Sequence, residues 1–227
     1  MTTAALAGST GLVGSNILAQ LLAHPSFASV YAYARRELPN PTASTKLNPI
    51  TSTETSIWPS LFPREMKPRV FFSGLGTTKA AAGSLEAQRK IDLDLNLELA
   101  RAAQEAGADT YVLISSANAS SKSSFAYPKM RGELEDAVQL LGFKHTVILQ
   151  PGLIVGDRNE SRPAEAAVRT LAKGLRSLTP ALTNFWAQDA SVIARAAVSA
   201  GVMCVEGKKE EGVWIVGQGD ITRLGKE

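Results

Sequence analysis

Short apolar runs alternate with helically spaced apolar positions along most of the 227-residue chain. The run Thr3–Ala7 is typical of a short strand, and Leu12–Ala23 repeats apolar residues with the spacing of a helix. The alternation continues, with strands predicted at Val30–Ala34, Val70–Ser73, Thr110–Ser115, Thr146–Leu149 and Val213–Val216, and helices at Glu86–Ala106, Pro128–Leu141, Pro163–Ser177 and Ala190–Val205. This order predicts an α/β protein with a doubly wound, mainly parallel sheet in a single domain over residues 1–227.

The stretch Glu37–Arg69 interrupts the pattern, since it is rich in proline, threonine and serine. We interpret it as an irregular excursion from the domain, with one further strand near Leu47–Thr51.

Composition excludes several classes of function. The formal net charge is only +3 and no long basic run is present, so nothing indicates nucleic-acid binding. Cys204 is the only cysteine and neither histidine belongs to a metal-binding motif, so we expect no disulfide and no metal site. No apolar run is long enough to span a bilayer, and the first residues resemble neither a secretory signal nor a transit peptide.

The strongest chemical signal lies between the first strand and the first helix, in the sequence Gly8-Ser9-Thr10-Gly11-Leu12-Val13-Gly14. Glycines let a phosphate approach the main-chain amides, and the helix N-terminus adds free N–H groups and a positive dipole end. The spacing G-x-x-G-x-x-G differs from the G-x-G-x-x-G of many NAD dehydrogenases. We expect a dinucleotide-binding Rossmann loop here; a glycine turn without a ligand is the alternative.

Arg35 and Arg36 follow the second strand, where a doubly wound sheet places the adenine ribose. An acidic residue there would favour NAD, whereas arginine suits a 2′-phosphate through charge-assisted hydrogen bonds. We therefore expect NADP(H), and the alternative is a solvated basic pair at a strand end.

Two further loops follow strands and contain small residues. Gly74, Leu75 and Gly76 come after Val70–Ser73, and Pro151-Gly152 comes after Thr146–Leu149. Glycines at the carboxyl ends of parallel strands permit a ligand to approach the backbone, so we expect both loops to contact the dinucleotide. Simple turns would give the same pattern.

The candidate reaction centre consists of Ser115 and Ser116 with Tyr127. A tyrosine can act as a general acid or base toward an alcohol or carbonyl when a nearby cation lowers its pKa, and a serine hydroxyl can hold the substrate oxygen. The position four residues after Tyr127, on the same helix face, is Arg131. A packed tyrosine at the start of a helix is the alternative.

Together these motifs resemble the atypical short-chain dehydrogenase/reductases over nearly the whole chain. Within that branch the chain is similar to the fungal "found in mitochondrial proteome" proteins and the animal Tat-interacting oxidoreductases. The resemblance rests on the Gly8–Gly14 loop, Tyr33–Arg36, Leu75–Thr78, Ile114–Ser116, Ser123–Tyr127, Arg131–Glu135, Pro151–Leu153 and Asp157–Pro163.

The resemblance implies that NADP(H) binds at Gly8, Ser9, Thr10, Gly11, Leu12, Val13, Arg35 and Arg36. It implies Tyr127 as the catalytic acid or base, with Ser116 or Ser115 as its partner. The lysine of the family falls on Arg131, which puts turnover in doubt more than cofactor binding. For the fungal relatives it also implies peripheral association with the cytosolic face of the mitochondrial outer membrane.

The segment 153–190 contains the expected basic amphipathic helix Pro163–Ser177. Such a helix can line the substrate pocket, contact an anionic membrane surface, or bury its apolar face within the domain. In the wider superfamily, the helices at Glu86–Ala106 and Pro128–Leu141 commonly form a homodimer face, so a homodimer is compatible with the sequence.

Three functions fit these residues. The first is an NADPH-dependent reductase acting on a small carbonyl or alcohol, and the second is a catalytically weak protein that senses NADP(H) and docks partners. Arg131 favours the second. The third is an epimerase-like or dehydratase-like enzyme, against which the short region after the Thr146–Leu149 strand counts, because it leaves little room for a nucleotide sugar.

Overall fold

A seven-stranded parallel sheet forms the centre of the computed structural model, which describes residues 1–40, 42–156 and 187–226. The strand order is β3-β2-β1-β4-β5-β6-β9. The strands are β1 (Thr2–Ala7), β2 (Phe27–Ala34), β3 (Leu47–Thr51), β4 (Val70–Ser73), β5 (Thr110–Ile114), β6 (His145–Leu149) and β9 (Gly212–Val216). The doubly wound parallel sheet expected from the sequence is confirmed.

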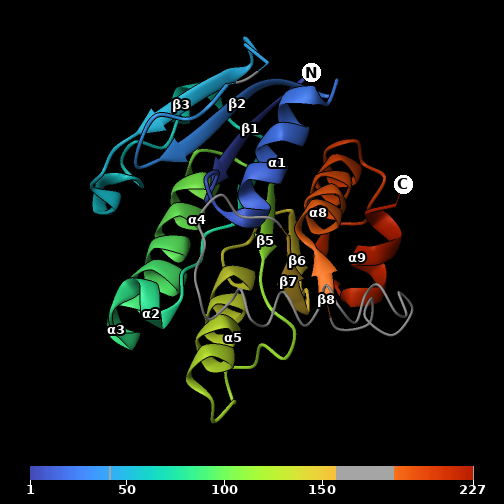
Figure 1. Cartoon of the computed structure of the whole chain (residues 1–227). Helices are drawn as coiled ribbons and strands as arrows, with labels where there is room; N and C mark the ends of the chain where they lie inside the picture. Colours follow the sequence, from blue (N-terminus) through green and yellow to red (C-terminus); the bar gives the residue numbers. More distant parts are fainter. Residues whose placement is uncertain (41, 157–186, 227) are drawn as a thin grey trace.

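Helices cover both faces of this sheet (Figure 1). One face packs against α1 (Leu12–Ala23), α8 (Ala190–Val205) and α9 (Gln218–Leu224). The other packs against α4 (Asn96–Glu105) and α5 (Ala126–Gln139). The central strands β1, β4, β5 and β6 are apolar on both faces because each face meets a helix layer.

The long helix expected at Glu86–Ala106 is divided. It consists of α3 (Leu85–Arg89), a π-helical turn at Lys90–Leu95, and α4, and the short α2 (Lys79–Ala82) precedes it. π-turns inside helices are frequent at functional sites because they free backbone carbonyls and re-aim side chains.

The Glu37–Arg69 excursion contains β3, as expected, and two short 3-10 turns at Thr55–Ile57 and Arg64–Met66. A second, two-stranded parallel sheet pairs β7 (Leu153–Val155) with β8 (Ala187–Asp189). The expected helix Pro163–Ser177 and the Asp157–Pro163 motif lie outside the described residues.

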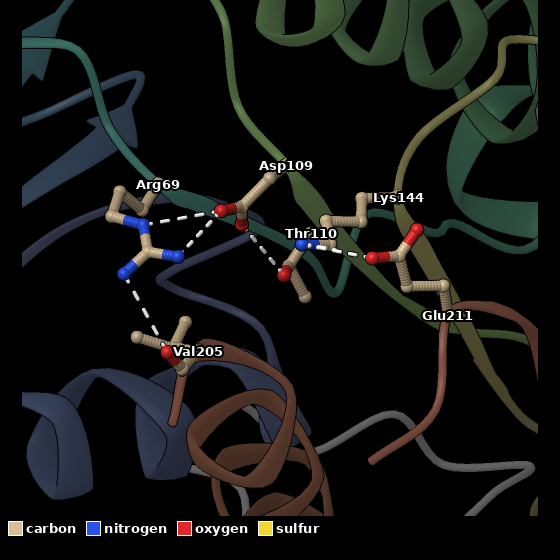
Figure 2. A network of polar contacts seen from close by, with 6 residues as sticks. All are labelled: Arg69, Asp109, Thr110, Lys144, Val205 and Glu211. Atoms are coloured by element: carbon tan, nitrogen blue, oxygen red, sulfur yellow. Dashed lines mark hydrogen bonds and ion pairs between the residues drawn. The ribbon is translucent and has the colours of Figure 1, made fainter. Parts of the chain in front are cut away.

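Ion pairs join the elements at the amino-terminal edge of the sheet (Figure 2). Arg69 Nη2 lies 2.6 Å from Asp109 Oδ2, and Arg69 Nη1 donates to the carbonyl of Val205 at 3.5 Å. Lys144 pairs with Glu211 at 2.9 Å. These partly exposed contacts link the starts of β4, β5 and β6 to the end of α8 and the start of β9, and exposed pairs of this kind contribute little to stability.

Candidate functional site

The glycine loop packs tightly against the loop that follows β4. Gly8 has φ +83°, and a Cβ there would lie 2.5 Å from the carbonyl carbon of Gly74. A Cβ at Gly14 would lie 2.0 Å from the carbonyl oxygen of Gly8. Both glycines are therefore required for the close approach of β1, α1 and the β4 loop, which meet where the strand order reverses.

The N-terminus of α1 has the features of an anion site. Gly11 is the N-cap residue and its N–H donates to Gly8 O at 2.9 Å, but it has no side chain to cap the helix. The first turn of this 12-residue helix also contains no acidic residue. The first N–H groups of a helix have no partner within it, so they can bind an anion.

Ser9 fixes the glycine loop to the end of β2. It is 2% exposed, and its hydroxyl donates to the carbonyl of Tyr33 at 2.6 Å. Arg35 and Arg36, two and three residues after Tyr33, are exposed just beyond the end of β2. The structure thus places the arginine pair and the glycine loop at neighbouring strand ends, in the arrangement that the sequence predicts.

Three buried polar residues hold the β4 loop from behind. Asp92 accepts from Thr77 N at 2.7 Å, Gln88 Nε2 donates to Thr77 O at 3.1 Å, and Asn96 forms a 2.5 Å hydrogen bond with Ser73 Oγ. Asn96 Nδ2 also donates to the carbonyls of residues 91 and 92 in the π-turn, at 3.2 Å each. In contrast, a Cβ at Gly76 would meet no atom within 4 Å, so that side of the loop is open.

Sequence reasoning missed these three residues. They lie four residues apart, at positions 88, 92 and 96, which places them along one helix face, and the structure buries that face. That spacing was a usable signal. Burial raises the pKa of Asp92, although its hydrogen bond from Thr77 N–H, the nearby Arg131 and Gln88 each lower it.

Tyr127 and Ser116 are accessible near the carboxyl end of β5. Tyr127 is the second residue of α5 and is 42% exposed, and Ser116 is half-buried. The intervening loop is pressed onto α5, because a Cβ at Gly132 would lie 2.1 Å from Ser121 N. The Ala117 N–H also donates to Pro151 O at 2.7 Å, which joins the β5 loop to the β6 loop.

Ser115 and Arg131 point into the protein instead. Ser115 is 4% exposed and donates its hydroxyl hydrogen bond to Glu135. Arg131 is 2% exposed; its guanidinium donates to the carbonyls of Ile114 and, at 3.4 Å, of Asp92. Of the four expected catalytic residues, the structure thus leaves Tyr127 and Ser116 accessible and places the other two in the interior.

The Pro151-Gly152 turn follows β6 and lies at the same carboxyl edge of the sheet as the glycine loop, which follows β1. Gly152 N donates to Gln188 Oε1 at 3.1 Å, which fixes the turn to β8, the strand that directly precedes α8. Further along, a Cβ at Gly156 would lie 3.1 Å from Leu12 Cδ1. The chain after β6 therefore passes over the first residue of α1.

This arrangement defines a doubly wound Rossmann fold. Solved structures with the same fold superimpose on most of the chain. They include UDP-glucose 4-epimerases from Bifidobacterium longum in complex with NAD+ and UDP (TM-score 0.69, 12% identity, covering 95% of this chain and 77% of that one) and from Thermotoga maritima with UDP-glucose (0.68, 12%, 99% and 81%). The Bordetella bronchiseptica enzyme WbmH in complex with NAD+ also matches (0.64, 16%, 95% and 75%).

The chain belongs to the HIM1 family, whose sequence profile matches residues 42–183. It is also 51% identical to "Protein fmp52-1, mitochondrial" of Aspergillus terreus, with all of both chains covered. It is 44% identical to "Protein fmp-52, mitochondrial" of Neurospora crassa, covering 100% of this chain and 96% of that one. The resemblance to the fungal proteins expected from the motifs is confirmed.

Proposed function

We propose that this protein binds NADP(H) along the carboxyl edge of its sheet and reduces a small carbonyl compound or oxidises the corresponding alcohol. The observation that carries the proposal is the uncapped N-terminus of α1 at the reversal of strand order, with two arginines at the neighbouring strand end. Solved structures of the same fold in complex with NAD support a nicotinamide dinucleotide.

The residues present fit this cofactor. The pyrophosphate would rest on the amides that open α1, and Arg35 and Arg36 would bind the 2′-phosphate. Gly76 has open space on its free side, so the β4 loop can approach a ligand without side-chain obstruction. Ser116 and Pro151-Gly152, which follow the neighbouring strands β5 and β6, would hold the nicotinamide half.

NADP(H) bound by these residues would supply or accept the hydride. Tyr127 would give a proton from its phenol to the substrate carbonyl oxygen, and the hydroxyl of Ser116 would hold that oxygen. The proton returns to Tyr127 in the opposite direction.

One observation favours a second function. Because Arg131 donates to buried backbone carbonyls, its guanidinium is committed to the interior and is not presented to solvent beside Tyr127. A protein that binds NADP(H) with little turnover, and reports the cofactor to a partner, is therefore the alternative.

Titration calorimetry with NADPH and NADH tests the cofactor, and NADPH consumption over a panel of aldehydes and ketones tests the reaction. We expect NADPH to bind more tightly than NADH, and the double substitution Arg35→Ala and Arg36→Ala to remove most of that difference. Equal affinity for the two cofactors would refute the assignment of the arginines. NADPH consumption that Tyr127→Phe leaves unchanged, or that is absent with every substrate, would favour the sensing function.

We also propose a peripheral position on the cytosolic face of the mitochondrial outer membrane. The relatives' names include "mitochondrial", which supports the organelle. No helix in the described part of the chain is both long and apolar enough to cross a bilayer. Protein released from purified mitochondria by alkaline carbonate, and degraded by protease while the outer membrane is intact, is the expected result; protection from the protease would contradict it.

A further inference from the structure

Three buried charged side chains lie behind the carboxyl ends of β4, β5 and β6. Asp92 is 1% exposed, Arg131 2% and Glu135 7%. The guanidinium of Arg131 is close enough to both carboxylates to lower the pKa of each, against the upward effect of burial. We call Asp92, Arg131 and Glu135 the buried charge cluster.

The members of the cluster bond the residues at the carboxyl ends of β4, β5 and β6. Asp92 accepts from Thr77 N in the β4 loop, and Arg131 donates to Ile114 O, the last residue of β5. Glu135 accepts from Ser115 Oγ with one oxygen and from Gln150 Nε2, at 2.9 Å, with the other. These two donors immediately precede Ser116 and Pro151-Gly152, respectively.

Stability alone does not account for such a cluster. Desolvating buried charges is unfavourable enough that well-packed apolar residues of similar volume are often as stable or more so. What Glu135 adds is directional: a carboxylate on α5 fixes the ends of two adjacent strands at once, through both of its oxygens.

We propose that Glu135 is a positioning residue that sets the nicotinamide half of the cofactor site by holding the β5 and β6 loops in register. The inference rests on the proposed function. Strand order separates the two halves of the ligand: the arginines that would bind the 2′-phosphate follow β2, whereas the loops held by Glu135 follow β5 and β6, on the other side of β1 and β4. Loss of Glu135 should therefore affect the nicotinamide half selectively.

The test uses two probes on the full chain. NADPH spans both halves, and adenosine 2′,5′-bisphosphate occupies only the adenine half. The variant Glu135→Gln replaces an acceptor of Gln150 Nε2 with an amide and removes the charge beside Arg131. Asp136→Asn, at the exposed neighbouring position, makes the same chemical change outside the cluster and is the matched control.

We expect Glu135→Gln to weaken NADPH binding about tenfold, the equivalent of one hydrogen bond to a charged group, with binding of the bisphosphate unchanged. Gln150→Leu removes only the β6-loop donor and should shift binding in the same direction if Glu135→Gln does not fold. Asp136→Asn should bind both probes like the wild type.

Two results would overturn the role. NADPH affinity that is unchanged in both Glu135→Gln and Gln150→Leu would show that the β5 and β6 loops do not need the hydrogen bonds of Glu135 to bind the cofactor. Parallel weakening of both probes would show a general structural effect. Wild-type protein that binds neither probe would refute the proposed function itself, a different result from either.

Discussion

Arg131→Lys is the substitution that most sharply separates a structural from a catalytic role for this residue. It introduces, four residues after Tyr127, the lysine that the resemblance to the short-chain dehydrogenase/reductases implies at this position, and it keeps the positive charge. If Arg131 acted on Tyr127 as a cation, the change would be conservative or would raise activity. If its guanidinium braces the interior, the change removes a fork that a single ammonium cannot replace.

The magnitude follows from the contacts of the guanidinium. Separate nitrogens of Arg131 donate to Ile114 O and, at a long 3.4 Å, to Asp92 O. A lysine nitrogen at that depth can keep one of these bonds at most, and a hydrogen bond to a charged group contributes about 1.5–3 kcal/mol. Because the lost bond can be the longer one, we expect the free energy of unfolding to fall by about 2 kcal/mol, with a melting temperature lower by about 4–8 °C for a chain of this size.

Urea unfolding followed by tryptophan fluorescence measures this loss, since Trp58 is 3% exposed and becomes hydrated on unfolding. Lys129→Arg, an exposed position on the same helix, is the control and should leave the midpoint unchanged. An Arg131→Lys protein as stable as the wild type, with faster NADPH consumption, would refute the interior role of Arg131.

Three further predictions concern packing, protonation and surface charge. Gly14→Ala should destabilise the fold by about 3 kcal/mol or more in the same unfolding assay, because its Cβ would lie 2.0 Å from Gly8 O, whereas Gly76→Ala should change little. Burial raises the pKa of Glu135, so the stability that its protonated form contributes is present at low pH and is lost as pH rises through the folded-state pKa. The free energy of unfolding of Glu135→Gln, measured from pH 4 to 8, should therefore rise relative to that of the wild type. A difference that stays constant with pH would contradict this. Arg69→Ala should lower the free energy of unfolding by no more than about 1 kcal/mol, since the Arg69 side chain is 50% exposed, and by less at high salt. A loss well above about 1 kcal/mol that high salt leaves unchanged would contradict this.

The sequence predicted the sheet and several of its covering helices well because their signals are local. The helix ranges Leu12–Ala23 and Ala190–Val205 and the strand range Val70–Ser73 match the observed elements, and β3 appears at Leu47–Thr51. The final helix α9 and the small β7–β8 sheet were not predicted, because seven-residue and three-residue elements carry too little periodicity.

The interior of the site was harder to predict, because it depends on partners distant in sequence. An arginine is expected at the surface, and Arg131 is buried only because carbonyl acceptors from β5 and the π-turn meet it there. Likewise, nothing in the sequence distinguishes Ser115 from Ser116, whereas in the structure the Ser115 hydroxyl donates to Glu135, twenty residues away. The π-turn itself has no strong sequence signal, apart from the buried polar spacing of residues 88, 92 and 96.

The central claim is that a pyrophosphate binds the free amides at the start of α1, and Gly11→Asp tests it directly. Gly11 has φ −77° and ψ 169°, a backbone conformation in which an aspartate can cap the helix. The aspartate side chain would thus accept from the free amides at the start of α1 and place a negative charge where the phosphates bind. Gly11→Asn is the control, because it adds similar bulk without the charge. Calorimetry should show NADPH binding lost in Gly11→Asp while the helix stays capped and the protein folded, and a Gly11→Asp protein that binds NADPH as tightly as the wild type would contradict the account.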